Sequence, residues 1–415
     1  MKDTKKHNDE KINLLSKKVD FKIYELLILI ILIIIVSAFL SYVLTKTLSS
    51  NVKGSSIFSN KDYNVEEFNE VYDLINDSYY KKVDKKKLIN GAINGMLESL
   101  GDPHTSYFNE SQTENFNEIM NGSYEGIGAE VSVDGNGNVI IVSVFKNSPA
   151  SEVGLKFGDI IKEVNGKNVK GMNTTEVVTL IKDPSSKTAT LKIQRDGKEL
   201  ELKLTKREIV IESVESKIYE SANKKIGYVV INTFANNTYE QFKENIEELE
   251  SKNIDGLIID VRGNSGGYLH SVTSMLDMFL PKGTISYQIQ DKKTVTKYKS
   301  NTSESRNYPI AVLVNKSSAS ASEILAIGLK ESYNADVIGT NTYGKGTVQV
   351  TKNLKSGGMI KYTIQKWLSP KGNWINEVGV EPTVKEELDK KYEENPSEDN
   401  DNQLQRAIDV VSNKK

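Results

Sequence analysis

A run of apolar residues near the amino terminus constrains this chain more than any other feature. From Leu26 to Leu44 the sequence LLILIILIIIVSAFLSYVL contains no charged residue. As a helix it would span roughly 28 Å, close to the ~30 Å hydrocarbon layer of a membrane. A buried core helix would normally carry a polar face, and a cleaved signal peptide would have a shorter apolar stretch followed by a small-residue cleavage site. The run therefore predicts an uncleaved transmembrane anchor, residues 23–45.

The charges on either side of this run predict its orientation. Seven lysines precede it, whereas only Lys46 and Lys53 follow it closely. Lysines next to a membrane span collect on its cytoplasmic side. We therefore expect residues 1–22 to form a cytoplasmic tail and residues 46–63 a linker. The rest of the chain is then extracytoplasmic, attached to the cell membrane by a single span.

The composition excludes several classes of protein. A chain of 415 residues, 38% hydrophobic and 27% charged, is long enough for two or three folded domains. Its formal net charge of -2 supplies no field that would attract nucleic acid. With no cysteine and only three histidines, the chain has no thiol nucleophile or thiolate metal site. We expect no metal and no cofactor.

Three sequence patterns divide the part that follows the anchor. Residues 64–120 carry apolar side chains at intervals of three and four, which predicts a helical region. Residues 121–205 contain short strands, two short helices and tight turns, among them a hairpin around Asp196-Gly197, which predicts a small β-barrel whose strand edges could bind a peptide. Residues 206–384 alternate strands and helices and include a hairpin-like pair from Thr347 to Trp367, which predicts a layered α/β core. Residues 385–401 are charged and poor in apolar side chains, which predicts a solvated linker or an exposed helix. Residues 402–415 are predicted to form a helix that packs back onto the body.

The segment NKSSASASEILAIGL places several serines at a turn between a strand and a helix. The strand ends at Asn315, and the helix begins near Ala321. A hydroxyl at such a turn lies beside the free N–H groups at the positive end of the helix, and these groups stabilise an oxyanion. The segment favours a serine nucleophile, although serines that only cap the helix would give the same pattern.

A serine nucleophile needs a base, and the sequence offers two. His270 follows the glycine-rich segment DVRGNSGG and could complete a Ser-His-Asp arrangement. Lys345 lies between two glycines in TYGKGTVQV, where burial could lower its pKa enough for it to act as a base. Lys345, Thr347 and Gln349 share one face of the strand, so Gln349 could orient the amine. A surface lysine in a hairpin would also explain GKG.

The glycines of DVRGNSGG, residues 260–267, leave N–H groups that can donate to an oxyanion or to a peptide carbonyl. A phosphate-binding loop is the main rival interpretation of such a segment. The pattern G-x-x-x-x-G-K-[ST] occurs nowhere in the chain, which argues against nucleotide hydrolysis.

Taken in order, these motifs resemble the carboxy-terminal processing peptidases, also called tail-specific proteases. The resemblance covers about residues 64–412 and rests on SLGDPHTSYF, YEGIGAEV, SPASEVGLKFGDII, DVRGNSGG, SASASEI and YGKGTVQ. It implies a serine endopeptidase with a Ser-Lys dyad. The implied fold is α/β (mixed α+β), with a ClpP/crotonase-like peptidase core, an inserted PDZ-like domain and a helical amino-terminal region. The PDZ-like domain would bind polypeptide substrates through their carboxy-terminal tails.

The resemblance also implies roles for particular residues. Three are catalytic side chains: Ser320 as the nucleophile, Lys345 as the general base and Gln349 as the residue that orients the lysine. The oxyanion would be held by the N–H groups of Ala321 and of Gly266, with Gly267 as an alternative to Gly266. The carboxylate-binding loop of the PDZ-like domain would be formed by Gly126, Ile127 and Gly128.

One position departs from the family pattern. Where many relatives have an arginine in a segment like LIRG, this chain has Leu180-Ile181-Lys182-Asp183. Lysine cannot make the bidentate contact that arginine makes, which puts any PDZ-linked switch through this position in doubt.

Two other functions stay open at this point. An inert, membrane-anchored PDZ scaffold would use the exposed strand edge of the barrel and cleave nothing. A hydrolase based on His270 would not depend on Lys345.

We also expect that the helices of residues 64–97 and 402–412 could join a homo-oligomer, and that a PDZ-like domain covering the cleft could couple tail binding to activity.

Overall fold

The computed structural model describes residues 65–303 and 306–414. The predicted cytoplasmic tail, anchor and linker lie outside the described residues. Within the described ranges, no helix is both long and apolar enough to cross a membrane. The chain divides into two units, residues 1–85 and 86–415, and each is described by itself.

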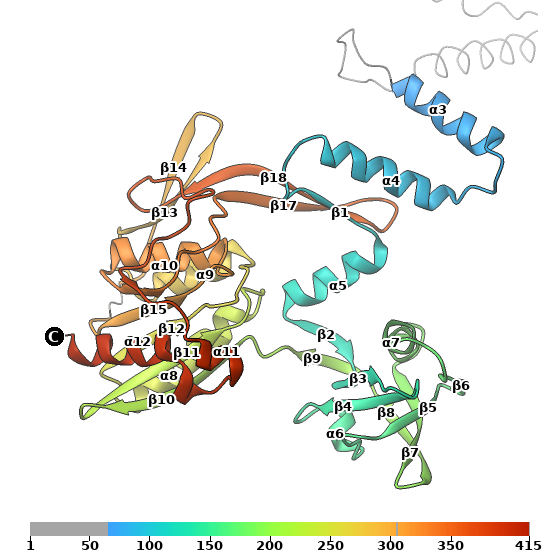
Figure 1. Ribbon diagram of the computed structural model, residues 1–415, viewed down its shortest axis with the longest axis horizontal. Coiled ribbons are helices and arrows are strands. Elements are labelled where there is room, and N and C mark those ends of the chain that lie inside the picture. Colours follow the sequence, from blue (N-terminus) through green and yellow to red (C-terminus); the bar gives the residue numbers. More distant parts are fainter. Residues whose placement is uncertain (1–64, 304–305, 415) are drawn as a thin grey trace, which may run out of the picture. The chain divides into compact units, whose positions relative to one another are not determined.

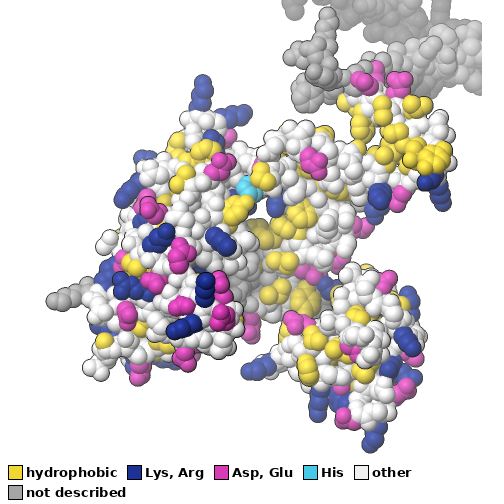
Figure 2. All heavy atoms as spheres, in the orientation of Figure 1, with side chains coloured by type: hydrophobic (Ala, Val, Ile, Leu, Met, Phe, Trp, Pro, Cys, Tyr) yellow, Lys and Arg dark blue, Asp and Glu magenta, His cyan; other side chains and the backbone are white. Residues whose placement is uncertain are grey.

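The described part of the first unit consists mainly of the helix α3 (Val65–Ser78), as the apolar spacing predicted. No residue of α3 is buried, and Figure 2 shows hydrophobic side chains gathered on its surface. These exposed side chains include Phe68, Val71 and Leu74.

The second unit opens with helix α4 (Lys85–Glu98), strand β1 (Ser106–Phe108) and helix α5 (Glu110–Asn121). Asn109 caps α5 by accepting a hydrogen bond from the Gln112 N–H group, and Gly122 ends it with φ 72°. The prediction that residues 64–120 are helical misses β1. This strand pairs with Met359–Lys361 of a strand late in the chain, so no local pattern marks it.

The PDZ-like region is an antiparallel sheet with its own hydrophobic core. Its sheet has the strand order β3-β4-β5-β7-β8, and β6 pairs with β5. The hairpin between β7 and β8 turns at Asp196 and Gly197, both with positive φ, as the Asp-Gly pair predicted. Ile141, Leu191 and Ile193 are fully buried. The elements are β2 (Ser123–Gly126), β3 (Ala129–Val133), β4 (Val139–Val144), α6 (Pro149–Glu152), β5 (Ile160–Val164), β6 (Lys167–Asn168), α7 (Thr174–Lys182), β7 (Thr188–Arg195), β8 (Lys198–Thr205) and β9 (Arg207–Val210).

A six-stranded sheet forms the centre of the peptidase core (Figure 1), in the order β10-β11-β12-β15-β16-β19. Its strands are β10 (Val214–Ser221), β11 (Lys224–Ile231), β12 (Gly256–Asp260), β15 (Ile310–Val314), β16 (Asp336–Gly339) and β19 (Val384–Lys385). All neighbours are parallel except β10 and β11. Helices cover both faces, so β12 and β15 are buried throughout, as is usual for parallel strands.

Alternate side chains of this sheet face different helices. Leu257 and Ile259 belong to the core beneath α8 (Thr238–Ser251), α9 (Leu269–Asp277) and α10 (Ala321–Ser332). Ile258 belongs to the smaller core beneath α12 (Asn402–Asn413). The two faces of β12 are therefore held by different parts of the chain.

A second sheet is built around the long strand β18 (Met359–Leu368), which pairs with β1, β13 (Ile285–Asp291) and β17 (Thr347–Asn353). Strand β14 (Thr294–Lys299) forms a hairpin with β13. The predicted hairpin from Thr347 to Trp367 is confirmed as β17 and β18. In this sheet β18 lies between β1 and β17, the strand that follows the Gly-Lys-Gly segment.

The carboxy-terminal segment contains an exposed helix, α11 (Lys390–Glu394), which was one of the two alternatives predicted for residues 385–401. It is followed by the short 3-10 helix Glu398–Asn400 and by α12. Asp401, at the end of the predicted linker, is buried. Helix α12 packs its apolar side chains Leu404, Ala407, Ile408 and Val411 against the central sheet, as predicted. The expectation that residues 402–412 could join a homo-oligomer stays a prediction.

Candidate active site

The serine-rich turn follows β15 and ends where α10 begins. Ser318 and Ser322 are fully buried, and their hydroxyls donate to the carbonyl oxygens of Val261 and Asn264, each at 2.8 Å. Ser317 is exposed. Ser320 is partly buried at the start of α10, with φ 55° and ψ -112°. Residues with a side chain rarely adopt such a backbone, which costs about 1 to 3 kcal/mol and persists only where surrounding contacts enforce it.

The glycine-rich loop after β12 lies directly against this turn. The Ala319 N–H group donates to the Asn264 carbonyl at 3.0 Å. A methyl group at Gly266 would lie 2.9 Å from Ser320 Cβ and 3.0 Å from the Ala321 nitrogen. Only a glycine, here with φ 104°, allows so close an approach.

The hydrogen bonds of this loop distinguish the two predicted glycine amides. Gly266 donates its N–H group to Asn264 Oδ1 at 2.8 Å. Within the described ranges, the N–H groups of Gly267 and Ala321 donate to no other group. Of the two glycines, Gly267 thus has the amide that is free to bind an oxyanion.

Lys345 lies in the Gly-Lys-Gly segment immediately before β17 and is partly buried. Burial, and next the positive charge of Lys361, lower the pKa of Lys345 from 10.5 to about 8, while Glu323 and Asp102 act in the opposite direction. Near pH 8, a large fraction of this amine is neutral and able to accept a proton.

Glu323, in the first turn of α10, connects the serine turn to the lysine segment. Its side chain is fully buried. Oε2 accepts hydrogen bonds from the N–H groups of Ser320 at 2.8 Å and Lys345 at 2.9 Å. Oε1 accepts from Thr342 Oγ1 and from the Gly344 N–H group, both at 2.6 Å. One carboxylate therefore fixes the backbones of both predicted dyad residues.

The only two tryptophans of the chain hold the same segment from its other side. The indole N–H group of Trp367 donates to the Lys345 carbonyl at 2.7 Å, and that of Trp374 to the Gly346 carbonyl at 2.8 Å. Sequence reasoning identified neither tryptophan nor the bridging role of Glu323.

Gln349 lies on the strand face that the sequence predicted. Its amide nitrogen donates to Thr347 Oγ1 at 2.9 Å and to Thr363 Oγ1 at 3.1 Å. No hydrogen bond joins it to Lys345 in the described part of the chain. Its role in orienting the amine stays a prediction, and its oxygen is the atom that would have to accept from Lys345.

The two histidines that follow the predicted anchor occupy different surroundings. His270 is exposed at the start of α9, with its ring against that of Tyr268. His104 is partly buried, with its ring centroid 6.4 Å from that of Tyr343. Burial, and next the charge of Lys345, lower the pKa of His104. The histidine that interacts electrostatically with Lys345 is therefore His104.

The predicted peptide-binding loop opens the PDZ-like region. Gly126 ends β2, Ile127 is buried in the core of the region, and Gly128 has φ 73°. A methyl group at Gly128 would lie 2.3 Å from Ser148 Cβ, so this position requires glycine. Lys182, at the end of α7, forms an ion pair of 2.6 Å with Glu118 of α5.

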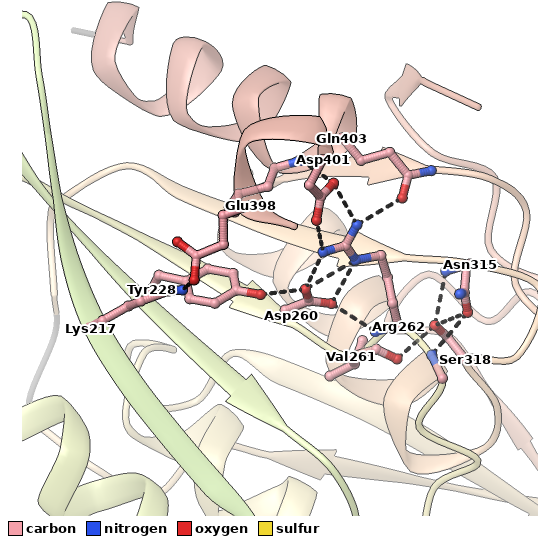
Figure 3. Close-up of polar contacts among 12 residues, drawn as sticks. Lys217, Tyr228, Asp260, Val261, Arg262, Asn315, Ser318, Glu398, Asp401 and Gln403 are labelled. Carbon is pink, nitrogen blue, oxygen red and sulfur yellow. Dashed lines mark hydrogen bonds and ion pairs between the residues drawn. The ribbon is translucent and has the colours of Figure 1, made fainter. Parts of the chain in front are cut away.

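Arg262 supports the glycine-rich loop from the face of the sheet that α12 covers (Figure 3). Its guanidinium lies between Asp260 and Asp401, with ion-pair distances of 2.6 and 2.7 Å. Burial disfavours the charged form, but Asp401 and Asp260 outweigh it and raise the pKa of Arg262. The Tyr228 hydroxyl donates to Asp260 at 2.7 Å. A cavity of about 860 Å³ beside this cluster contains none of the predicted catalytic residues.

Comparisons with known proteins bear on the identity of this fold. Peptidase family S41 matches residues 225–386, a PDZ domain matches residues 125–205, and the N-terminal domain of the activating protease CtpB matches residues 34–112. The carboxy-terminal processing protease CtpB of Bacillus subtilis is 42% identical over 79% of this chain and 68% of its own length. CtpA of the same organism is 38% identical over 86% of this chain and 76% of its own length.

A probable CtpA-like serine protease of Staphylococcus aureus is 34% identical over 89% of this chain and 74% of its own length. These matches run through the PDZ region and the peptidase core, with the mixed α/β architecture described above. The chain therefore belongs to the carboxy-terminal processing peptidases of family S41 and is a serine peptidase with a PDZ domain.

Proposed function

We propose that this peptidase cleaves polypeptides with a Ser320–Lys345 dyad. The neutral Lys345 amine takes the proton of the Ser320 hydroxyl as Oγ attacks the peptide carbonyl carbon. The resulting oxyanion accepts hydrogen bonds from the amides of Ala321 and Gly267. Lys345 then returns the proton to the leaving amine, which gives an acyl-enzyme. Water, activated by the same amine, releases the acyl group and restores Ser320.

The observation that carries this proposal is the shared support of the two residues by Glu323. Its Oε2 accepts from the backbone N–H groups of both Ser320 and Lys345. The lysine segment is therefore held at the start of the helix that carries the serine. A partly buried amine in this place, with a pKa of about 8, suits a general base that works near neutral pH.

The rate of cleavage should depend on the charge of Lys345. Below pH about 8 the amine is increasingly protonated, so kcat/KM should fall about tenfold per pH unit and level off above that value. The measurement is cleavage of a neutral, unstructured peptide between pH 5 and pH 10 by the full-length protein in mild detergent. His270→Ala should leave the profile unchanged. Loss of activity in His270→Ala would support the histidine-based hydrolase instead.

We also infer that substrates are held through their carboxy-terminal tails by the PDZ domain. The two Bacillus subtilis relatives are carboxy-terminal processing proteases. The loop at Gly126, Ile127 and Gly128 precedes β3, an edge strand of the domain, and an edge strand can bind an extended peptide. The scaffold alternative requires tail binding without cleavage, and no feature of the described residues favours it.

Attachment to the membrane is the last part of the proposal. The uncharged run from Leu26 to Leu44 supports it, together with the lysines that precede this run. Deleting residues 1–45 should move the protein from the membrane fraction to the soluble fraction while leaving peptide cleavage intact. An intact full-length protein that washes off membranes in alkaline carbonate would contradict the anchor.

A further inference from the structure

A second lysine, Lys361, lies in the strand that pairs with β17, which follows the proposed catalytic base. It is in β18, opposite Ser106 of β1 and Thr351 of β17. Its ammonium lies over the rings of Phe108 and Phe116, 5.5 and 5.8 Å from their centroids. It forms no ion pair within residues 65–303 and 306–414. The two aromatic faces stabilise a positive charge at this partly buried position.

Asp102 approaches the same strand from the turn before β1. It accepts hydrogen bonds from the His104 N–H group at 2.9 Å and from Thr105 Oγ1 at 2.6 Å. Thr105 Oγ1 in turn accepts from the Thr363 N–H group at 3.2 Å. Thr363 is two residues from Lys361 on the same face of β18, and its hydroxyl binds the amide of Gln349.

These contacts form a continuous connection from the turn at Asp102 to the strand that follows Lys345. The turn contributes a carboxylate and β18 contributes an ammonium. The two side chains carry opposite charges, and neither belongs to the proposed dyad. The motif SLGDPHTSYF, which the proposed mechanism does not otherwise use, is thereby connected through hydrogen bonds to Gln349.

On the basis of the dyad mechanism above, we propose that Lys361 and Asp102 are opposed positioning residues that set the charge state of Lys345. Lys361 favours the neutral amine that accepts the serine proton. Asp102 favours the protonated amine and limits the effect of Lys361. Neither residue touches the reacting atoms.

The electrostatics of the site agree with this arrangement. After burial, Lys361 is the main cause of the lowered pKa of Lys345, whereas Glu323 and Asp102 raise it. His104 also faces this group of charges. Burial lowers the pKa of Lys361 as well, but Asp102 opposes that shift. Lys361, Glu323, Asp102 and His104 are therefore the groups whose charges reach Lys345 from the elements around it.

The test compares the pH dependence of kcat/KM for full-length variants on a neutral peptide. Lys361→Met should move the rising part of the profile to higher pH by about half a unit to one unit, because the base loses a neighbouring positive charge. At pH 7 this is about a three- to tenfold loss, recovered near pH 10. Asp102→Asn should move the profile in the opposite direction. Lys361→Arg should keep the wild-type profile.

Lys352→Met is the matched control, because Lys352 is an exposed lysine of the neighbouring strand β17. If Lys361→Met does not fold, Lys361→Gln and Asp102→Asn still test the opposite directions of the shift. The pH dependence with which a fluorophosphonate labels Ser320 gives the same information without a substrate. A uniform loss of rate at every pH, or shifts in the same direction, would overturn the inference. Activity that survives Lys345→Ala would instead reject the dyad itself.

Discussion

Replacing Ser320 by alanine should lower kcat by roughly 10⁴-fold or more, because it removes the atom that forms the acyl-enzyme. Lys345→Ala should cause a loss of similar size, since an unassisted hydroxyl is a weak nucleophile near neutral pH. The double variant should be no slower than either single variant, because the two residues act as one unit. Single-turnover cleavage of a fluorogenic peptide at pH 8 measures all three variants.

Ser317→Ala is the matched control for this experiment. Ser317 belongs to the same turn, but it is exposed and its hydroxyl takes part in no hydrogen bond among the described residues. It should cleave at the wild-type rate. Ser320→Ala should still bind a peptide tail, which separates lost chemistry from a lost fold. Cleavage by Ser320→Ala at the wild-type rate would reject this serine as the nucleophile.

Replacing Glu323 by glutamine should lower kcat by roughly 10²- to 10³-fold, although neither dyad side chain is altered. The carboxylate accepts four hydrogen bonds, and an amide retains one oxygen to accept them. The new NH₂ group would face two donors and leave buried polar groups unsatisfied. We expect the free energy of unfolding to fall by about 2 to 4 kcal/mol, measured from the midpoint of urea unfolding.

The pH profile distinguishes a positioning role of Glu323 from a general loss of stability. Glu323 raises the pKa of Lys345, so its neutralisation should not move the rising part of the profile to higher pH. Glu331→Gln is the control in the same helix, where the carboxylate accepts a hydrogen bond from the Lys371 N–H group. A folded Glu323→Gln variant with unchanged kcat would show that the bridge between the two segments is dispensable.

Local patterns in the sequence predict much of the fold. The hairpin at Asp196 and Gly197, the strand pair from Thr347 to Trp367 and the apolar face of α12 all follow from the spacing of neighbouring residues. Strand β1 does not, because its partner lies more than two hundred residues later and three residues carry no detectable period.

The candidate active site, like the fold, can be predicted from local sequence patterns only in part. Ser320 and Lys345 stand out because each lies in a short motif, and their catalytic roles stay predictions. The Ser-x-x-Glu spacing identifies Glu323 as a residue of the first helical turn. Its contacts with Thr342, Gly344 and Lys345 depend on how α10 packs against a later segment. A sequence motif cannot specify such contacts, because they follow from the tertiary fold.

The pair formed by Arg262 and Asp401 makes the glycine-rich loop depend on the carboxy-terminal segment. Asp401 directly precedes α12, so a variant that lacks residues 401–415 would lose both this ion pair and the helix that covers one face of the central sheet. We expect such a variant to be less stable, because the largely buried guanidinium of Arg262 would lose one of its two charged partners.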